Sequence, residues 1–346
     1  MKIGKYYFER QIQDMRFRSK NSNICVSALT CVCLGNIILL YIFKNLQAEY
    51  VWQQNIAVQS RRTIEMPKEI ILQKSPTEDE SYIVNEPLLC NNQTVDLIIV
   101  VCSSLDHFKQ RQAIRETWGN ITQETFRVKL IFLVGKWTQK QFSRINASFF
   151  TETSKYKDIV QGNFIDSYRN LTLKSISMLR WVNTYCSHAN YLLKVDDDMY
   201  INIPNLFSAI YKQVVKLFIM GNLIIGAKPV QDNTSKWYTP KKLFPEENYP
   251  HYVSGTAYVI SGCAIPKIYS SAKSTKPFWL EDIFITGICA KKAGIHHIHR
   301  NDMTFDTLEN YDCAFKSLIS VHRIKWQHMY FVHHNVISGL RDSCDQ

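Results

Sequence analysis

Several features that would point to common protein classes are missing from this sequence. None of its ten cysteines has the spacing of a zinc site. The acidic run at 196–198 lacks the spaced acids, the glycine and the late glutamate of an EF-hand loop. No internal repeat is evident. What remains is an ordinary globular composition, 46% hydrophobic and 21% charged over 346 residues, which allows one large domain or two smaller ones.

Charge is also missing from residues 24–43, a stretch about as long as a helix that crosses a bilayer. Residues 1–23 hold six basic residues against two acidic ones, a net charge of +4. This excess predicts a cytosolic tail at 1–23, a transmembrane signal anchor at 24–43 and a lumenal remainder. A cleaved signal peptide is the alternative, although its apolar region is usually shorter and its charged leader is rarely this long.

The remainder of the chain suits an oxidising lumen. Five Asn-x-Ser/Thr sequons follow the apolar segment and none precedes it. Of the formal net charge of +11, +7 lies after the tail, which favours an anionic small molecule over nucleic acid in that compartment. Seven cysteines follow the segment, so some should pair, and at least one is free or pairs between chains. A homodimer linked through such a cysteine is therefore one possible assembly.

The character of the sequence changes near residue 90. Residues 44–90 show no sustained periodicity and contain three prolines and the acidic run TEDE. This composition predicts a lumenal stem with little core of its own. A folded lumenal domain is expected over 91–346.

Apolar, β-branched runs alternate with amphipathic stretches in that domain. The alternation predicts an open, doubly wound α/β sheet with buried parallel strands. Strands are expected at 95–102, 128–134 and 191–195, and helices at 106–118, with Asp106 as a candidate N-cap, and at 171–186.

Three consecutive aspartates, Asp196, Asp197 and Asp198, follow the third strand. Open α/β sheets bind ligands just beyond the carboxyl ends of their strands, and carboxylates are ligands that suit Mg²⁺ or Mn²⁺. Because side chains alternate along an extended segment, Asp196 and Asp198 should face one way and Asp197 the other. A D-x-D pair can thus reach a metal ion and the ribose or phosphates of a nucleotide. The alternative is a solvated acidic turn, although mostly apolar segments flank the run.

Six sequence blocks together resemble a known family. In order they are RQAIRETWG (111–119), FIDSYRNLTLK (164–174), KVDDDMYIN (194–202), SKWY (235–238), YPHYVSGTAYVIS (249–261) and LEDIFITGIC (280–289). The set is similar to the Golgi β-1,3-galactosyl- and β-1,3-N-acetylglucosaminyltransferases and covers roughly residues 90–330. The resemblance implies a GT-A fold, in which a Rossmann-like nucleotide half joins an acceptor half. It also implies a UDP-sugar donor, Mn²⁺ and inversion at the anomeric carbon, giving a β1→3 link.

The resemblance implies a metal site. Asp198 should ligate Mn²⁺, with Asp196 and Asp197 supporting the metal and the ribose. The ion would stabilise the charge that grows on departing UDP. In the family a late histidine also ligates the metal, and His322 occupies that place. Taken alone, His322 would more often be a packed or surface histidine.

The resemblance also implies a general base, Asp282, which would take the proton from the acceptor 3-hydroxyl. Glu281 could orient the acceptor. The residues alone allow another interpretation, in which both acids are favoured by the dipole of a following helix, a placement that would lower the pKa of a base. Between Asp282 and Gly287 the chain has one residue more than the EDVYVG form common in the family.

Two arginines and a lysine are implied near the nucleotide. Arg111 and Arg115 lie four residues apart on one predicted helical face, where guanidinium groups could meet phosphate or uracil. Surface pairing with Glu116 or Asp106 is the alternative. Lys174 is a similar case.

Four further residues are candidates for sugar contacts. Trp237 and Tyr238 could stack on a sugar ring, although aromatic pairs are more often part of a core. Ser254 and Gly255 suggest a close approach of the backbone to the donor sugar.

By resemblance, Cys90 pairs with Cys186 and Cys289 with Cys313. The favoured function is transfer of galactose from UDP-galactose to an acceptor glycan on a glycoprotein or glycolipid at the Golgi membrane. UDP-N-acetylglucosamine is the alternative donor. A non-catalytic lumenal binding protein on the same fold and a metal-dependent hydrolase are the competing functions.

Overall fold

The computed structural model describes the backbone of residues 82–91, 93–121, 126–137, 139–305 and 317–338. The predicted tail, the predicted membrane anchor at 24–43 and most of the predicted stem lie outside these ranges. Within them, no helix has both the length and the apolar character needed to span a bilayer.

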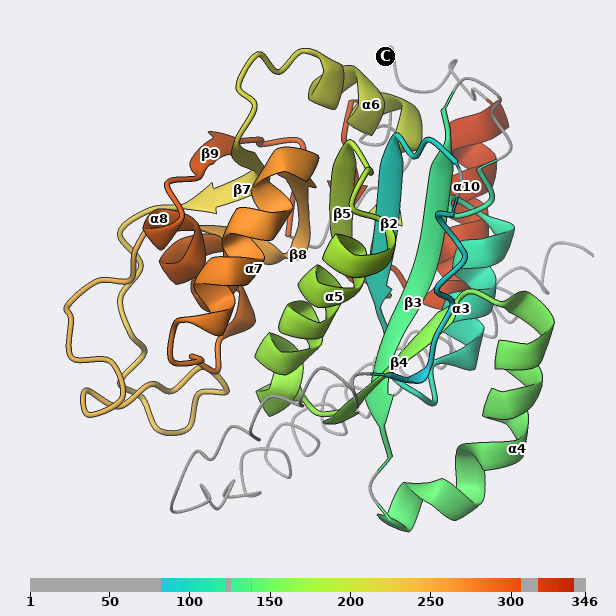
Figure 1. The fold of residues 1–346 in the computed structure, drawn as a ribbon, viewed down its shortest axis with the longest axis horizontal. Coiled ribbons are helices and arrows are strands. Elements are labelled where there is room, and N and C mark those ends of the chain that lie inside the picture. The colour runs from blue at the N-terminus through green and yellow to red at the C-terminus, as the bar shows by residue number, and fades with distance from the viewer. Residues whose placement is uncertain (1–81, 92, 122–125, 138, 306–316, 339–346) are drawn as a thin grey trace, which may run out of the picture. The chain divides into compact units, whose positions relative to one another are not determined.

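A mixed sheet of eight strands runs through the described domain, in the order β1-β4-β3-β2-β5-β8-β7-β9 (Figure 1). Four neighbouring strands are parallel, β2 (Leu97–Cys102), β3 (Val128–Lys136), β4 (Ile159–Ile165) and β5 (Tyr191–Asp196), and β2, β3 and β5 confirm the predicted strands. The remaining strands are β1 (Tyr82–Val84), β7 (Phe218–Ile224), β8 (Tyr252–Ser261) and β9 (His296–His299). Because β8 runs antiparallel to both β5 and β7, the sheet is mixed rather than wholly parallel.

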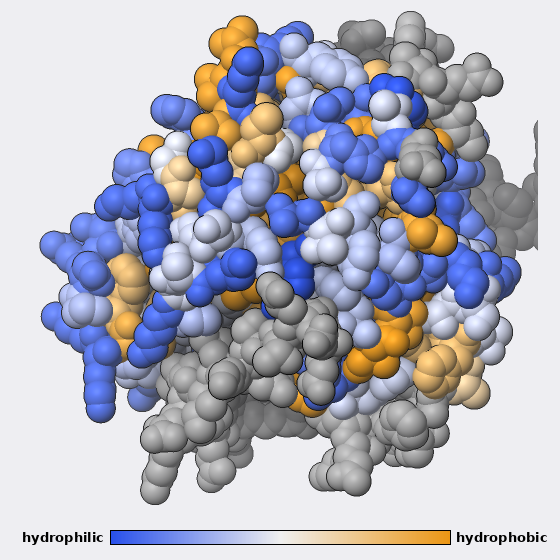
Figure 2. Space-filling view, viewed as in Figure 1, coloured by the Kyte–Doolittle hydropathy of each residue, from blue (hydrophilic) through white to orange (hydrophobic). Residues whose placement is uncertain are grey.

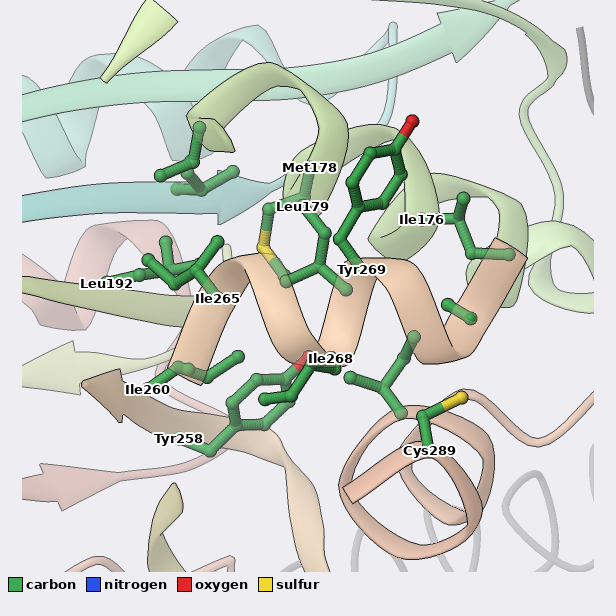
Figure 3. Close-up of a cluster of buried hydrophobic side chains, with 14 of the residues drawn as sticks. Ile176, Met178, Leu179, Leu192, Tyr258, Ile260, Ile265, Ile268, Tyr269 and Cys289 are labelled. Carbon is green, nitrogen blue, oxygen red and sulfur yellow. The ribbon is translucent and has the colours of Figure 1, made fainter. Parts of the chain in front are cut away.

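Helices cover both faces of this sheet, as expected for a doubly wound fold (Figure 1). Alternate residues of β2 enter two separate apolar cores, since successive side chains of a strand point to opposite faces. One core includes α5 (Leu171–Tyr185) and α7 (Ile265–Lys273), whose side chains interdigitate in Figure 3. The other includes α3 (Phe108–Glu116), α6 (Ile203–Tyr211) and α10 (Trp326–Ser338), with α4 (Gln139–Tyr156) contributing Phe149.

One detail of α3 differs from the sequence prediction. Its N-cap is His107 rather than Asp106, and no side-chain bond caps the helix. His107 instead turns its ring to Asp197, at a distance of 2.7 Å. The side chain at the helix start is therefore used for a contact across the sheet edge.

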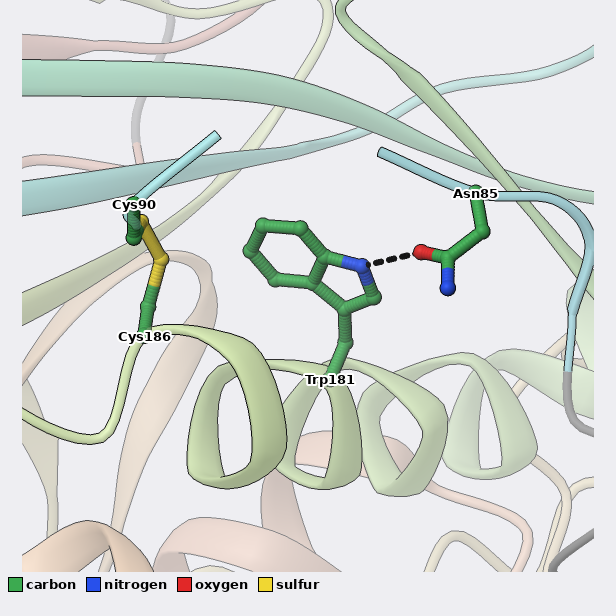
Figure 4. The surroundings of a disulfide bond; sticks show 4 residues. All are labelled: Asn85, Cys90, Trp181 and Cys186. Carbon is green, nitrogen blue, oxygen red and sulfur yellow. Dashed lines mark hydrogen bonds between the residues drawn. A yellow bond between two sulfur atoms is a disulfide. The ribbon is translucent and has the colours of Figure 1, made fainter. Parts of the chain in front are cut away.

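A disulfide fastens the start of the described chain to the domain. Cys90 and Cys186 are bonded, with 5.4 Å between their Cα atoms, which confirms this pair (Figure 4). Nearby, the Trp181 indole donates to the Asn85 side chain over 2.8 Å. Residues 82–90, which the sequence assigned to the stem, are thus part of the folded domain. Cys289 is buried without a disulfide partner among the described residues, and its predicted partner at position 313 lies outside them.

Two small elements complete the architecture near the aspartates. Strands β6 (Tyr200–Ile201) and β10 (Ser320–Val321) pair in a separate two-stranded sheet. The segment after Asp282 is a π-helix, η4 (Ile283–Cys289), followed by α8 (Ala290–Lys292). A π-turn holds one residue more than an α-turn, which agrees with the extra residue noted between Asp282 and Gly287.

Candidate active site

The aspartate run lies where two parallel strands end side by side. Cys102, the last residue of β2, is in register with Asp196, the last residue of β5. Ser103 follows Cys102, and its hydroxyl donates to Asp197 Oδ2 over 2.7 Å. The same oxygen is 2.7 Å from His107 Nδ1, and this bond raises the pKa of His107. Asp197 therefore points to the β2–α3 loop.

Asp198 meets His322, as the resemblance implied. Val321 of β10 pairs with Tyr200 of β6, so His322 is brought opposite the aspartates, with its Nε2 3.4 Å from Asp198 Oδ2. His322 Nδ1 lies 2.9 Å from the Phe305 carbonyl, which can only accept, so Nδ1 donates and Nε2 is aimed at Asp198. Histidines that ligate metals are commonly oriented in this way. Burial acts to raise the pKa of Asp198, but His322 and nearby donors hold it below its usual value.

Asp196 meets a buried lysine, Lys194. The ammonium lies 2.5 Å from Asp196 Oδ1 and also donates to the Gly255 carbonyl on β8. Burial acts to lower the pKa of Lys194, but Asp196 and Glu281 together raise it above its usual value. Burial also raises the pKa of Asp196 to about 6, even though 36% of its side chain is exposed. Lys194 is thus the positive charge that offsets the acidic cluster.

Glu281 and Asp282 lie against the same glycine. A Cβ atom on Gly255 would come within 3.2 Å of both Glu281 Oε2 and Asp282 Cβ, so a side chain at this position would push on both acidic residues. Glu281 accepts a 2.7 Å bond from the buried Tyr258 hydroxyl. Asp282 Oδ1 accepts from the Ile283 amide over 2.9 Å.

The charge environment of Asp282 resolves the question of its helix position. Burial, and next the charge of Glu281, raise its pKa to about 6, whereas the Ile283 amide and Lys194 act in the opposite direction. The effect of the helix start is therefore outweighed. A carboxylate with this pKa is ionised at neutral pH and is a stronger base than an exposed aspartate.

The structure places Arg111 in a network within the protein. All five of its N–H groups are used, by both oxygens of Glu152, by Ser103 Oγ, and by the carbonyls of Ser104 and Leu105. The side chain is fully buried. Of the proposed partners, neither Glu116 nor Asp106 is involved, because the partner carboxylate comes from α4.

Arg115 and Lys174 are also engaged with protein carboxylates. Arg115 makes two bonds to Asp158, of 2.7 and 2.8 Å, and one to Glu152. Lys174 Nζ lies 2.7 Å from Asp166 and donates to the Ser103 carbonyl over 2.7 Å. Lys174 and Arg111 therefore both hold the loop that follows β2, and their contact with a nucleotide stays a prediction.

The SKWY block lies on the surface. Trp237 is 49% exposed, and Lys236 Nζ lies 4.5 Å from the centre of its ring and 5.9 Å from that of Tyr168. Tyr168 packs edge-on against Trp279, three residues before Asp282, with ring centres 6.4 Å apart. Tyr238 is half-buried. Trp237 is thus the member of the pair whose ring a sugar could reach.

Ser254, by contrast, is buried. Its hydroxyl lies 3.4 Å from that of Thr256, and its neighbour Gly255 carries the carbonyl that Lys194 holds. The contribution of this segment is therefore its backbone.

Three residues at this site were given no role from the sequence: Lys194, His107 and Tyr258. Lys194 carried a usable signal, because a lysine two positions before Asp196 in a buried strand must face the same side and needs a counter-charge. His107 and Tyr258 carried none, since their partners are 90 and 23 residues away.

Across the face drawn in Figure 2, apolar side chains lie in separated patches among polar ones.

Comparisons with known proteins agree with this site. A family model described as galactosyltransferase matches residues 109–301. Beta-1,3-galactosyltransferase 1 of Homo sapiens is 34% identical over 267 residues, 76% of this chain and 80% of that protein. Beta-1,3-galactosyltransferase 2 of Homo sapiens is 32% identical over 272 residues, 75% and 64% of the two chains. The solved structure of WbbM, a bifunctional glycosyltransferase, overlaps with a TM-score of 0.36 at 11% identity, covering 67% of this chain and 46% of that one. This overlap is too low to support a conclusion.

An α/β sheet with paired carboxylates at its ligand edge, together with these relatives, defines a hexosyltransferase. The match covers more than half of the chain and includes the aspartate run and Asp282. The chain belongs to the galactosyltransferase family.

Proposed function

We propose that the protein is a Golgi β-1,3-galactosyltransferase of GT-A type, anchored as a type II membrane protein, which transfers galactose from UDP-galactose to the 3-hydroxyl of an acceptor glycan. The observation that carries this proposal is that two acidic sites both adjoin Gly255. At the first site, Lys194 bonds both Asp196 and the Gly255 carbonyl, and Asp198, two residues further on, meets His322. At the second site, Glu281 and Asp282 lie close to Gly255. The curated relatives named above supply the sugar and the linkage.

The donor would bind at the carboxyl ends of β2 and β5. This is the position where open α/β sheets take nucleotides, and the loop after β2 is held there by Arg111 and Lys174. The charge of the part beyond the tail, +7, favours an anionic ligand such as UDP-sugar.

Asp198 and His322 would be the protein ligands of Mn²⁺. The orientation of His322 by the Phe305 carbonyl and the 3.4 Å approach of Nε2 to Asp198 fit a divalent ion. The described residues contain no group of three His, Cys, Asp or Glu side chains that could hold a metal ion, and Asp196 is paired with Lys194. Two ligands are sufficient where substrate phosphates complete the coordination. When bound, the ion would neutralise charge on the leaving diphosphate.

Asp282 would act as the general base. Its carboxylate accepts the proton of the acceptor 3-hydroxyl while that oxygen bonds to C1 of galactose and the bond from C1 to the phosphate oxygen of UDP breaks. Attack from the face opposite UDP inverts the anomeric configuration and gives the β1→3 link. Tyr258 fixes Glu281 beside the base, where Glu281 could orient the acceptor and, by its charge, keeps the pKa of Asp282 raised.

The test is a donor and acceptor screen with the full-length chain in detergent and Mn²⁺. UDP-galactose should be turned over onto a GlcNAc-, GalNAc- or Gal-terminated glycan, with a β1→3 link in the product by NMR. Asp282→Asn and Asp198→Asn should each lose at least about 100-fold in kcat/KM, because each removes a group that acts on the reacting atoms. Asp232→Asn, in an exposed turn, is the matched control and should keep activity.

Three outcomes would overturn parts of the proposal. Turnover of UDP-N-acetylglucosamine alone would replace the donor. Release of sugar without transfer to an acceptor would indicate a hydrolase. If the folded protein turned over no UDP-sugar, the result would favour the non-catalytic binding protein.

The predicted membrane orientation has its own test. In intact microsomes, the domain should resist added protease while the N-terminal tail is cleaved, and enzymatic removal of N-glycans should increase its mobility. Digestion of the domain in intact vesicles would contradict a lumenal location.

A further inference from the structure

Thr286 lies inside the π-helix η4, four residues after Asp282, and is fully buried. Its hydroxyl makes contacts outside the helix as well as within it. It accepts a 2.8 Å bond from the Val253 amide and lies 3.0 Å from the Val253 carbonyl and 2.6 Å from the Asp282 carbonyl. One side-chain oxygen thus joins the backbone of the proposed base to the strand that carries Ser254 and Gly255.

Strand β8 is irregular near Val253, where its pairing with β7 is interrupted. Leu223 of β7 is in register with Val253, and Gly221 is in register with Tyr258. Between these two pairs β8 therefore contains three more residues than β7 does. An irregularity of this size disrupts the ladder locally and bends the strand. Ser254 and Gly255 lie within it, and the Thr286 hydroxyl holds the residue just before them.

The helix is fixed from its other side as well. His297 of β9 lies with Nε2 2.6 Å from the Thr286 carbonyl, so the imidazole donates to it. Gly287 packs against Pro250 and Tyr252, since a Cβ there would lie 3.2 Å from a carbon of each. The π-turn is therefore clamped between β8 and β9 through Thr286 and the residue that follows it.

We propose that Thr286 is a positioning residue, whose hydroxyl sets the distance between the Asp282 carboxylate and the Ser254–Gly255 backbone. This inference rests on the proposed role of Asp282 as the base. Asp282 lies so near Gly255 that a Cβ atom on the glycine would come within 3.2 Å of Asp282 Cβ, which leaves little space between the base and this segment. Removing the hydroxyl leaves the buried Val253 amide without this acceptor and one nearby backbone carbonyl without this donor, and it lets the π-turn relax. A shift of the base by about 1 Å can cost about 100-fold in rate.

The experiment compares Thr286→Val with Thr286→Ser in the full-length enzyme, using UDP-galactose and its acceptor. Thr286→Val should lower kcat by about 10- to 100-fold while the KM for the donor stays within about twofold, because only the base is displaced. Thr286→Ser keeps the hydroxyl and should stay within about threefold of the parent kcat. Thr117→Val is the matched control, since Thr117 is also buried and bonds the carbonyl four residues earlier.

The outcomes separate this inference from the function on which it rests. If Asp282→Asn keeps full turnover, the assignment of the base fails whatever Thr286 does. If Asp282→Asn is inactive but Thr286→Val, with unchanged UDP affinity by calorimetry, keeps its kcat, the positioning role alone is wrong. A Thr286→Ser variant that binds UDP normally but loses as much kcat as Thr286→Val would also refute it, because the hydroxyl would then not be the operative group.

Discussion

Replacing Arg111 by lysine decides between the two roles considered for this arginine. The guanidinium donates five hydrogen bonds from a fully buried position, and three of its acceptors lie in the loop that follows β2. Lysine keeps the positive charge but offers three donors from a single atom. At least two buried acceptors therefore lose their partner.

The magnitude follows from those acceptors. Each buried acceptor left unpaired costs about 1–3 kcal/mol, so Arg111→Lys should lower the free energy of unfolding by about 2–6 kcal/mol. For a domain of this size, a loss of 4 kcal/mol corresponds to a fall in melting temperature of about 8–16 °C. Thermal unfolding of the full-length protein, followed by tryptophan fluorescence, measures it directly.

The matched control is Arg127→Lys. Arg127 also bonds an aspartate, Asp96, but 58% of its side chain is exposed. Its melting temperature should stay within about 2 °C of the parent, since solvent replaces the lost bonds. If Arg111→Lys melts like the parent and instead raises the KM for UDP-galactose by about tenfold or more, the guanidinium serves the nucleotide and the structural reasoning is refuted.

Three further predictions follow from the site and the disulfide. Because the pKa of Asp282 is raised to about 6 and the base must be ionised, kcat/KM should rise with pH and reach half its maximum near pH 6; a flat profile from about pH 5 to 8 would exclude this base. Lys194→Met should lower the free energy of unfolding by about 2–3 kcal/mol at neutral pH, a figure reduced because Asp196 is partly exposed. The loss should be smaller at low pH, because the carboxylates left without a cation are then protonated, and an equal loss at both pH values would contradict this account. Cys90→Ser opens a disulfide that spans 96 residues and should lower stability by about 3–5 kcal/mol, whereas Cys263→Ser, at an exposed cysteine with no disulfide partner in the described part of the chain, should not change the melting temperature.

Much of the fold followed from short-range pattern. The apolar runs at 95–102, 128–134 and 191–195 became β2, β3 and β5, because a strand buried on both faces must be apolar throughout. The direction of β8 did not follow from pattern. An antiparallel strand in a mixed sheet has the same buried, apolar residues as a parallel one, so YVSGTAYVIS carries no signal of its orientation.

The partners of the arginines show a second limit of sequence reasoning. Spacing placed Arg111 and Arg115 on one helical face, but Glu152 and Asp158 lie about forty residues further along the chain. Only the packing of α4 and the start of β4 beside α3 brings these carboxylates to the guanidinium groups. A pattern of residues four apart contains no information on a partner so distant.

The sequence by itself determined the acidic run, its position at the end of a buried strand and, through six ordered blocks, the family. The tertiary structure decided what Asp197 and Asp198 meet. Register between β2 and β5 brings Asp197 to Ser103, and the pairing of β6 with β10 brings Asp198 to His322. Asp196 differs, because the two-residue period of the strand is enough to place Lys194 beside it. The pKa of Asp282 depends in the same way on burial and on Glu281 rather than on its place at a helix start. The physical reason is that the charge state of a carboxyl group depends on the atoms within a few ångströms of it, and those atoms come from segments that only folding brings together.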